Sequence, residues 1–482
     1  MPDFAISSGS LFISPCKEKP ACRSSISAVR GTLCFLFVFV VVSSAQSYKI
    51  VSNFDTNGVS GPINTPVQGL DGNLYGAFNN GFGEDGIYSL TPNGTVTNVQ
   101  AFSDYEYIGG ALIPLPDGSF YGTTVQGGAN SAGTVFTITP AGVFTLLHTF
   151  STNDNHGSFP GQLILANSGN FYGYTASGGV AGNGTIFSIT PAGSLRIVFT
   201  FNDSNGGAAN SLIQGTDGNF YGTTYLGGAD NLGTVFKLTP DGVLTTLHSF
   251  SGSDGSGPYG GLVQGNDGNF YGVTVWGGDL TCNPATGCGS IFKVTTAGSL
   301  ATLHNFEIDD GLNPYSALVQ GNDGNLYGTT FYGGADQQGT IFEIVPGGTF
   351  TQLHSFDPNF EDGGNPISTP MQDTNGSFYG TTPFGGNFNA GVAYRLSAPG
   401  LGPFVRTLPS SGTIGSTVII LGTGLTGATS VDFAGTVASF NVISSSEISA
   451  IVPAGSHSGR VHVTLPKVML NSNAIFMIQT GR

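Results

Sequence analysis

The chain has 482 residues and a formal net charge of −16, and glycine accounts for 77 of its residues. Only 9% of the residues are charged, whereas 39% are hydrophobic and 11% aromatic, which excludes a disordered chain and a polar helical bundle. The shortage of Lys and Arg excludes a general nucleic-acid partner, because neutralising phosphates requires clustered positive charge.

The first 45 residues are predicted to be a secretory signal peptide. A short apolar run, TLCFLFVFVVV (32–42), follows two arginines and precedes small residues that end at Ala45. As a helix this run rises about 17 Å, which is too short for a bilayer core of about 30 Å. We therefore expect cleavage between Ala45 and Gln46 and no membrane span in the mature chain. An uncleaved membrane anchor is the alternative.

A repeated phrase fills residues 46–399. It reads DGNFYG with small changes, and its seven copies begin at residues 71, 117, 168, 217, 267, 323 and 375. Each copy is followed by a phrase such as GTVFKLTP and then, except in the last, by one such as LTTLHSF. This regular recurrence indicates seven structural units of about fifty residues each.

Each unit is predicted to supply four antiparallel strands. Asp-Gly and Pro-x-Gly pairs mark tight turns between them, because glycine tolerates the positive φ that such turns require. In the fourth unit the strands are expected at 211–215, 219–224, 233–239 and 244–250. Four strands in a unit of this length are typical of a propeller blade, so the sequence predicts an all-β, seven-bladed β-propeller.

The two ends of the repeats predict that the propeller is closed. The seventh unit ends after VAYRL (392–396) and lacks a fourth strand, whereas the mature chain begins with YKIVSNF (48–54), which aligns with LTTLHSF. The N-terminal strand would complete the last blade and leave no open sheet edge. An open solenoid would instead carry atypical capping units at both ends.

Two cysteines remain once the leader is removed, and they are close in the sequence. Cys282 and Cys288 lie in DLTCNPATGCGS, and a secreted protein with two such cysteines favours a local disulfide. A metal site would need further ligands, and no histidine lies between Trp276 and Ala301.

The repeated phrases resemble those of the secreted bacterial tandem-repeat propellers called the GloVer, or Gloeo-Verruco, family. The resemblance rests on DGNFYGTT, GG, GTVFKLTP and LHSF, and it covers about residues 48–396. It implies a propeller but no shared activity or catalytic set.

Residues 400–482 break the repeat and are predicted to form a second domain. The segments PSSGTIGSTVIILGTGL (409–425), SVDFAG, ISAIVPAG (448–455) and GRVHVTL resemble an IPT/TIG immunoglobulin-like domain, which implies a β-sandwich. This domain has four Lys or Arg and two Asp or Glu, whereas residues 46–399 have five Lys or Arg and 25 Asp or Glu. The acidity of the chain therefore belongs to the predicted propeller.

Four histidines share one position in the fourth strand of their units, namely His148, His248, His304 and His354. In a propeller the fourth strand lies at the rim, so these side chains cannot converge on one metal ion. We interpret them as packing or hydrogen-bonding residues between blades, and we interpret the repeated tyrosine of FYG in the same way.

The longer loops on one face of the predicted propeller carry the candidate binding residues. Aromatic residues, among them Tyr225, follow the second strand beside Gly-Gly pairs. Carboxylates lie in the loops that lead from one unit to the next. Long loops on a rigid scaffold usually carry function. The candidate ligand-binding residues are Trp276, Tyr332, Phe384, Asp309, Asp310, Glu361 and Asp362. The alternatives are that the acidic residues only form turns and that the rings pack onto the blades below them.

Aromatic rings with carboxylates suit sugars, because the rings pack on pyranose faces and the polar groups bind hydroxyls. We therefore expect a secreted, non-catalytic extracellular or cell-surface protein that binds a glycan or another surface protein as a monomer. A carbohydrate-active enzyme, either a glycoside hydrolase or a lyase, is an alternative, and so is a structural matrix component. No cofactor is expected, and the oxygen-rich segment 307–314 is the alternative, as a candidate for holding Ca²⁺.

Exported protein is expected to begin at Gln46, because the short apolar run and the small residues before it fit signal-peptidase cleavage. Mass spectrometry of the intact secreted protein measures this terminus. An intact leader on exported protein would identify the run as an uncleaved anchor.

Overall fold

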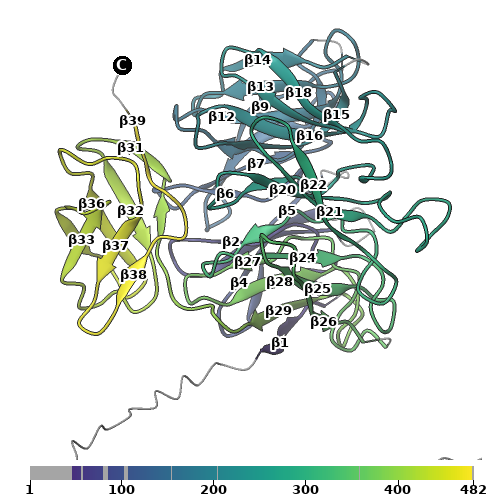
Figure 1. Cartoon of the computed structure of the whole chain (residues 1–482). Helices are drawn as coiled ribbons and strands as arrows, with labels where there is room; N and C mark the ends of the chain where they lie inside the picture. Colours follow the sequence, from purple (N-terminus) through teal and green to yellow (C-terminus); the bar gives the residue numbers. More distant parts are fainter. Residues whose placement is uncertain are drawn as a thin grey trace, which may run out of the picture. The chain divides into compact units, whose positions relative to one another are not determined.

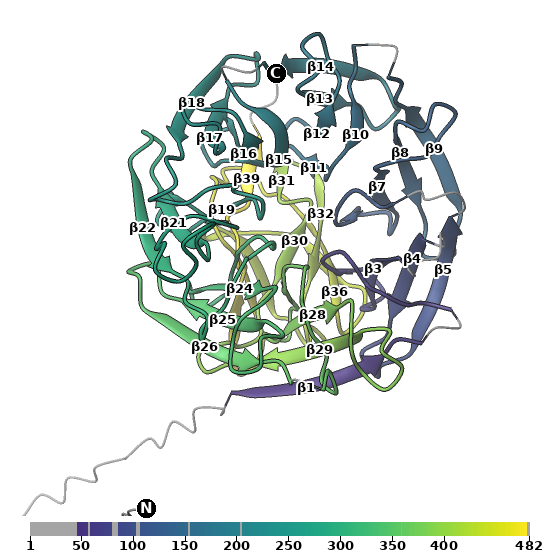
Figure 2. The same cartoon turned by 90° about the vertical axis from the view of Figure 1, so that its right-hand side faces the viewer.

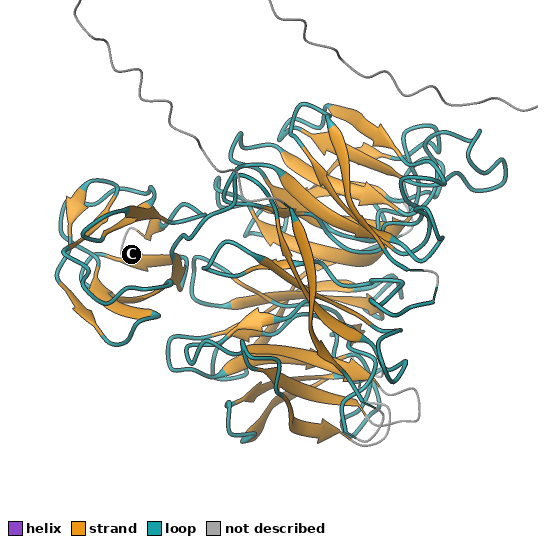
Figure 3. Cartoon of the chain, turned by 90° about the horizontal axis from the view of Figure 1, so that it is seen from below, coloured by secondary structure: helices purple, strands orange, loops and turns teal. Residues whose placement is uncertain are grey.

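The computed structural model describes residues 46–55, 58–79, 85–102, 107–152, 155–202, 205–357 and 359–479. Every regular element in these ranges is a β-strand, as Figure 1 and Figure 3 show, so the all-β prediction is confirmed. The predicted leader, including Ala45, lies outside the described residues.

Between residues 47 and 397 the described strands form seven antiparallel sheets, one for each repeat. The first sheet contains β2 (Val67–Gln68), β3 (Leu74–Asn79), β4 (Asp85–Leu90) and β5 (Val96–Phe102). The second contains β6 (Ile113–Pro114), β7 (Phe120–Thr124), β8 (Thr134–Ile138) and β9 (Phe144–Thr149). The third contains β10 (Ser158–Pro160), β11 (Ile164–Leu165), β12 (Phe171–Ser177), β13 (Thr185–Ile189) and β14 (Leu195–Thr200).

The remaining sheets follow the same order. The fourth contains β15 (Gly207–Gln214), β16 (Phe220–Leu226), β17 (Thr234–Leu238) and β18 (Leu244–Ser249), and the fifth contains β19 (Leu262–Gln264), β20 (Phe270–Thr274), β21 (Ser290–Val294) and β22 (Leu300–Asn305). The sixth contains β23 (Val319–Gln320), β24 (Leu326–Thr330), β25 (Thr340–Ile344) and β26 (Phe350–Ser355). The seventh contains β27 (Met371–Gln372), β28 (Phe378–Thr382), β29 (Val392–Ser397) and β1 (Ser47–Asn53).

Figure 2 shows these sheets following one another in chain order, with the last strand of each sheet at the periphery and β1 beside β29. The two strands pair antiparallel from Ser47 opposite Ser397 to Asn53 opposite Val392. Four-stranded antiparallel sheets in this order are compatible with a propeller-like fold. The fourth sheet differs from the sequence prediction at β15, which starts at Gly207 instead of Ser211. The strand continues past a bulge between Ala209 and Ser211, so that Gly207 pairs with Leu226 of β16.

The tyrosine of the repeated phrase packs each sheet against the next one. Tyr221 stacks on Phe270 of the fifth sheet, with ring centroids 4.0 Å apart. Where the next phrase reads LYG, leucine takes the place of the phenylalanine, and Tyr379 of the seventh sheet shares a buried cluster with Leu74 of the first. The same aromatic or aliphatic contact therefore joins successive sheets and also the last sheet to the first.

The glycine of the phrase leaves room for an aromatic ring of the third strand. Gly272 lies opposite Phe292 in the β20–β21 ladder, and a Cβ atom on it would lie 2.5 Å from the Phe292 Cζ. Gly222 has the same relation to Phe236 in the fourth sheet. A side chain at this position would collide with the ring, which explains why glycine recurs there.

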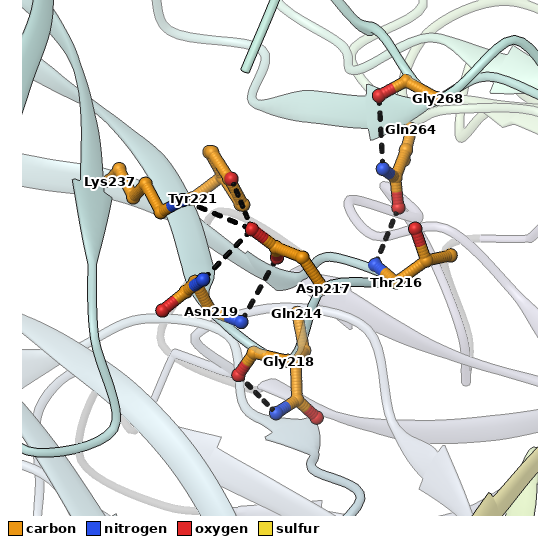
Figure 4. Close-up of polar contacts among 9 residues, drawn as sticks. All are labelled: Gln214, Thr216, Asp217, Gly218, Asn219, Tyr221, Lys237, Gln264 and Gly268. Atoms are coloured by element: carbon orange, nitrogen blue, oxygen red, sulfur yellow. Dashed lines mark hydrogen bonds and ion pairs between the residues drawn. The ribbon is translucent and has the colours of Figure 1, made fainter. Parts of the chain in front are cut away.

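The aspartate of the phrase closes the turn before the second strand (Figure 4). Asp217 accepts hydrogen bonds from the Asn219 backbone N–H (3.1 Å), the Tyr221 hydroxyl (2.8 Å) and the Lys237 ammonium (3.1 Å). Burial acts to raise the pKa of this carboxyl, but hydrogen bonds from the side chains of Asn219, Tyr221 and Lys237 outweigh it and lower the pKa to about 2.

A glutamine of the first strand ties neighbouring turns together (Figure 4). The Gln264 side chain accepts a hydrogen bond from the Thr216 N–H of the fourth sheet (2.9 Å) and donates one to the Gly268 carbonyl of its own turn (3.1 Å). Gln320 makes the equivalent pair of contacts one sheet further along. The turns of successive sheets are thus fixed relative to one another.

The C-terminal strands form two further four-stranded sheets and a parallel pair. One sheet takes the order β30 (Arg406–Leu408), β32 (Thr417–Leu421), β36 (Glu447–Ile451) and β35 (Phe440–Val442). The other takes the order β34 (Thr436–Val437), β33 (Ser430–Phe433), β37 (Val461–Thr464) and β38 (Met469–Asn471), and β31 (Ser411–Thr413) pairs with β39 (Met477–Gln479). Val418, Ile420 and Val463 are among the residues of one buried core, as expected for a β-sandwich.

Replacing Gly272 by alanine is expected to lower the free energy of unfolding by about 1–3 kcal/mol, because the new Cβ overpacks the Phe292 ring. Gly347→Ala is the matched control, since a Cβ at Gly347 meets nothing within 4 Å. Chemical denaturation measures both variants. Equal stability of the two would show that the glycine is not required by packing.

Candidate functional site

Each of the seven sheets has two ends with different connections. At one end lie the tight Asp-Gly and Pro-x-Gly turns, which we call the turn face. At the other end lie the links from the second to the third strand and from the fourth strand to the next sheet, which we call the loop face. In the fifth sheet these loop-face links are residues 275–289 and 250–261.

Three of the predicted aromatic residues occupy equivalent positions on the loop face. Each forms an antiparallel bridge with the link that enters its sheet, as Ser256–Trp276, Leu312–Tyr332 and Gly364–Phe384. In each case the carbonyl of the aromatic residue accepts a 2.9 Å hydrogen bond from a buried threonine two positions earlier. The aromatic residues of the fifth, sixth and seventh sheets therefore lie at one site of the repeat.

Tyr225 does not share this position, and it lies within β16 rather than in the loop where the sequence analysis placed it. The carbonyl that accepts the equivalent threonine bond in the fourth sheet belongs to Leu226, not to Tyr225. Since successive side chains of a strand point to opposite faces, Tyr225 points to the other side from Leu226.

The entering links are fastened beside these aromatic residues by repeated backbone contacts. The Gly334 N–H donates to the Ile308 carbonyl (2.9 Å), and the Leu312 N–H donates to the Tyr332 carbonyl (2.7 Å). Asp309 lies between these two contacts and is exposed. In the seventh sheet the equivalent contacts flank the exposed Glu361. Tyr332 and Phe384 therefore each have an exposed carboxylate in the link that enters their sheet.

The adjacent carboxylates, Asp310 and Asp362, have a different place. Asp310 contacts the His304 imidazole (2.9 Å) and accepts a hydrogen bond from the Glu307 N–H (2.8 Å). Asp362 makes the equivalent contacts with His354 and with the Asp357 N–H, at 2.8 and 2.9 Å. The four predicted carboxylates thus divide into two that are exposed and two that hold the links in shape.

Two of the four repeated histidines, His304 and His354, pack against a ring of the neighbouring sheet, as the sequence indicated. The His304 ring stacks on Phe350 of the sixth sheet, with centroids 4.0 Å apart and planes within 6°. The His354 ring stacks on Tyr48 of β1 at 3.8 Å. Together with their aspartates, these rings connect a loop-face link to the rim of the neighbouring sheet.

Six aromatic rings form a continuous row over the fourth, fifth and sixth sheets, which we call the aromatic arc. Its successive ring centroids are 4.5–6.2 Å apart, with the planes steeply inclined. In spatial order its members are Trp276, Tyr225, Tyr259, Tyr315, Phe331 and Tyr332. Among the described residues, no ring contact joins Phe384 to this row.

Sequence reasoning missed three members of the arc. Tyr259 and Tyr315 each follow a proline just before the first strand, and Phe331 precedes Tyr332. A comparison of the repeats could have found the two tyrosines, because the equivalent residues of the third and fourth repeats are Gly161 and Asn210. The two tyrosines are therefore not required by the fold.

The arc is partly open to solvent. Tyr259 is 51% exposed, Tyr332 is 46% exposed and Phe384, beyond the arc, is 47% exposed. Burial raises the pKa of Tyr315, and the nearby Tyr332 hydroxyl raises it further, so its hydroxyl stays neutral and can donate a hydrogen bond.

Trp276 also lines a groove. The groove has a volume of about 530 Å³, and its walls include Ser253, Ser256 and Thr286. The Trp276 ring lies against the backbone at Gly257, where an added Cβ would be 3.0 Å from the ring. The link that forms one wall contains the Cys282–Cys288 disulfide, whose Cα atoms are 6.0 Å apart.

The described part of the chain contains no group of three or more His, Cys, Asp or Glu residues arranged to hold a metal ion. In the segment considered for Ca²⁺, residues 307–314, Asp310 is engaged by His304 and a backbone N–H. The described residues also include no helix of the length and apolarity needed to cross a membrane.

Comparison with family models decides the relationship of the chain. The model described as the Gloeobacter/Verrucomicrobia repeat matches residues 107–284 and 212–439, and the IPT/TIG domain model matches residues 404–475. The chain belongs to the Gloeobacter/Verrucomicrobia repeat family. Both resemblances seen in the sequence are thereby confirmed, and this repeat protein carries a C-terminal IPT/TIG domain.

The repeat protein is also similar to several solved structures, at low identity. One is a structural genomics protein of unknown function from Bacteroides thetaiotaomicron VPI-5482 (14% identity, TM-score 0.43, 73% of this chain and 76% of that chain). A second is a luciferin-regenerating enzyme (13% identity, TM-score 0.40, 75% of this chain and 98% of that chain). A third is a gluconolactonase from Xanthomonas campestris (14% identity, TM-score 0.35, 59% of this chain and 91% of that chain). No curated protein compared with the chain matches it.

Asp310→Ala is expected to lower the free energy of unfolding by about 1–3 kcal/mol, because the Glu307 N–H and His304 lose their partner. Asp309→Ala, its exposed neighbour, is expected to change that energy by less than about 0.5 kcal/mol. Thermal and denaturant unfolding of the two variants compare them directly. Similar losses in both would contradict the division of roles between the two carboxylates.

Proposed function

We propose that this repeat protein is an extracellular or cell-surface binding protein without catalytic activity, and that its ligand is a glycan or another surface protein. The observation that carries this proposal is the aromatic arc on the loop face, where Tyr259 and Tyr332 are about half exposed. Large exposed aromatic groups on a soluble protein commonly mark interaction sites.

The proposed scaffold is a closed, seven-bladed β-propeller over residues 46–399, after a cleaved signal peptide (1–45) and before an IPT/TIG domain (400–482). The pairing of β1 with β29 supports closure, and so does the buried cluster shared by the first and seventh sheets. A closed ring leaves no sheet edge for aggregation, which suits a monomer outside the cell.

The proposed binding residues are those on or beside the three equivalent aromatic positions. Trp276, Tyr332 and Phe384 supply rings, and Asp309 and Glu361 supply exposed carboxylates. Asp310 and Asp362 act indirectly, because they hold the links that carry these carboxylates. A pyranose face packs well on such rings, while carboxylates and phenol hydroxyls bind sugar hydroxyls.

The test is a glycan-array screen of the mature full chain, together with an assay for newly released reducing ends. We expect saturable binding without release. Tyr332→Ala is expected to weaken binding about tenfold at a nearly unchanged melting temperature, because about half of the side chain is exposed and available to a ligand. Val243→Ala, an exposed apolar residue on the turn face, is the matched control.

Other outcomes identify other functions. Release of reducing ends would identify a carbohydrate-active enzyme, and the absence of any glycan or protein ligand would favour a structural matrix component. A large fall in the melting temperature of Tyr332→Ala with retained affinity would show that this ring serves packing.

A further inference from the structure

The positive side chains of the repeat region all lie toward the turn face. Lys237 and Lys293 contact the turn aspartates of their own sheets, at 3.1 and 2.8 Å. The Arg395 guanidinium donates to the Ser377 hydroxyl (2.9 Å), which follows the last Asp-Gly-type turn, and Lys49 lies opposite Arg395 in the β1–β29 ladder. Arg196, the remaining one, lies one residue into β14, directly after a Pro-x-Gly turn.

The loop face, in contrast, carries carboxylates and no Lys or Arg from residues 46–399. The links that enter the sixth and seventh sheets alone contain six, namely Glu307, Asp309, Asp310, Asp357, Glu361 and Asp362. Among the described residues the ion-pair partners of these side chains are the histidines of Asp310 and Asp362. Two neighbouring links on the face that bears the aromatic arc are therefore rich in negative charge.

One member of the aromatic arc, Tyr315, shares the link that enters the sixth sheet with three of these carboxylates. Tyr315 follows Asp309 and Asp310 in the link that enters the sixth sheet, and backbone contacts hold that link beside Tyr332. Tyr259 follows Asp254 in the preceding link. Aromatic faces attract cations as carboxylates do, so both kinds of group at this site favour a positively charged ligand.

We propose that the aromatic arc binds an amino-sugar polymer with free ammonium groups, an inference that rests on the glycan-binding function proposed above. Such a polymer presents a pyranose face for each ring and an ammonium group for the carboxylates and aromatic faces in one compact residue. A lysine side chain supplies an ammonium group on a flexible stem but no sugar face, so a basic peptide uses only part of this site.

The experiment compares three probes with the mature full chain by calorimetry: a short chitosan oligosaccharide, its fully N-acetylated counterpart, and a polylysine peptide of similar charge. A slightly acidic buffer keeps the chitosan amines protonated. We expect the chitosan oligosaccharide to bind at least about tenfold more tightly than the acetylated one, and its affinity to fall as salt is added.

Matched variants locate the binding. The double variant Asp309→Asn/Glu361→Gln is expected to weaken chitosan binding about tenfold, whereas Asp241→Asn, an exposed acid on the turn face, leaves it unchanged. Tyr259→Ala is expected to weaken binding as well, and the melting temperature of each variant shows that it is folded.

Three results would contradict the proposal in different ways. Equal or tighter binding of the acetylated oligosaccharide would overturn the requirement for charge while leaving the glycan-binding function standing. Polylysine binding as tight as chitosan would make the partner a basic protein and overturn the proposal. Binding of none of the probes, together with an empty glycan array, would remove both the proposal and the function on which it rests.

Discussion

An aromatic ring on the third strand of each sheet lies against a glycine of the second strand, and a tyrosine beside that glycine packs on the next sheet. Gly222 and Phe236 form the first contact in the fourth sheet, and Tyr221 and Phe270 form the second. Because neighbouring residues of one short phrase serve both contacts, packing within a sheet and packing between sheets are set together. The phrase can therefore be repeated along the chain without compensating changes elsewhere in the sheet.

This arrangement leaves the loop face free to differ between repeats. The turn face is fixed by Asp217, Gln264 and their equivalents, which hold each turn and connect it to the next. On the loop face, backbone contacts and one internal aspartate hold the conformation of a link, as Asp310 does in the link that enters the sixth sheet. The neighbouring position, Asp309, is exposed, so it can change with little cost in stability.

Much of the fold could be predicted from the sequence, because the information is local and repeated. Asp-Gly turns, alternating apolar residues and the spacing of FYG locate the strands to within a few residues, and the main departure is β15, which a bulge extends. The equivalence of Trp276, Tyr332 and Phe384 was also readable, since each precedes a Gly-Gly pair.

The contacts of the site could not be predicted in the same way. Tyr259 and Tyr315 belong to different repeats, and their rings meet only because the sheets lie side by side. The opposite roles of Asp309 and Asp310 depend on which carboxylate turns toward His304, and two adjacent acids in a loop do not reveal this. Tyr225 was expected in a loop but lies within β16, one residue before the position that corresponds to Trp276.

The segregation of charge between the two faces has a physical consequence beyond ligand binding. Lys49, Arg196, Lys237, Lys293 and Arg395 are gathered toward one end of the strands, whereas the other end has exposed carboxylates such as Asp309 and Glu361 and no Lys or Arg, which gives the repeat region an electric moment along its strands. Near any negatively charged surface such a moment produces a torque that turns the acidic face, and the aromatic arc with it, away from that surface. Salt limits this effect to separations of about 10 Å. The protein would thus be oriented before any specific contact forms.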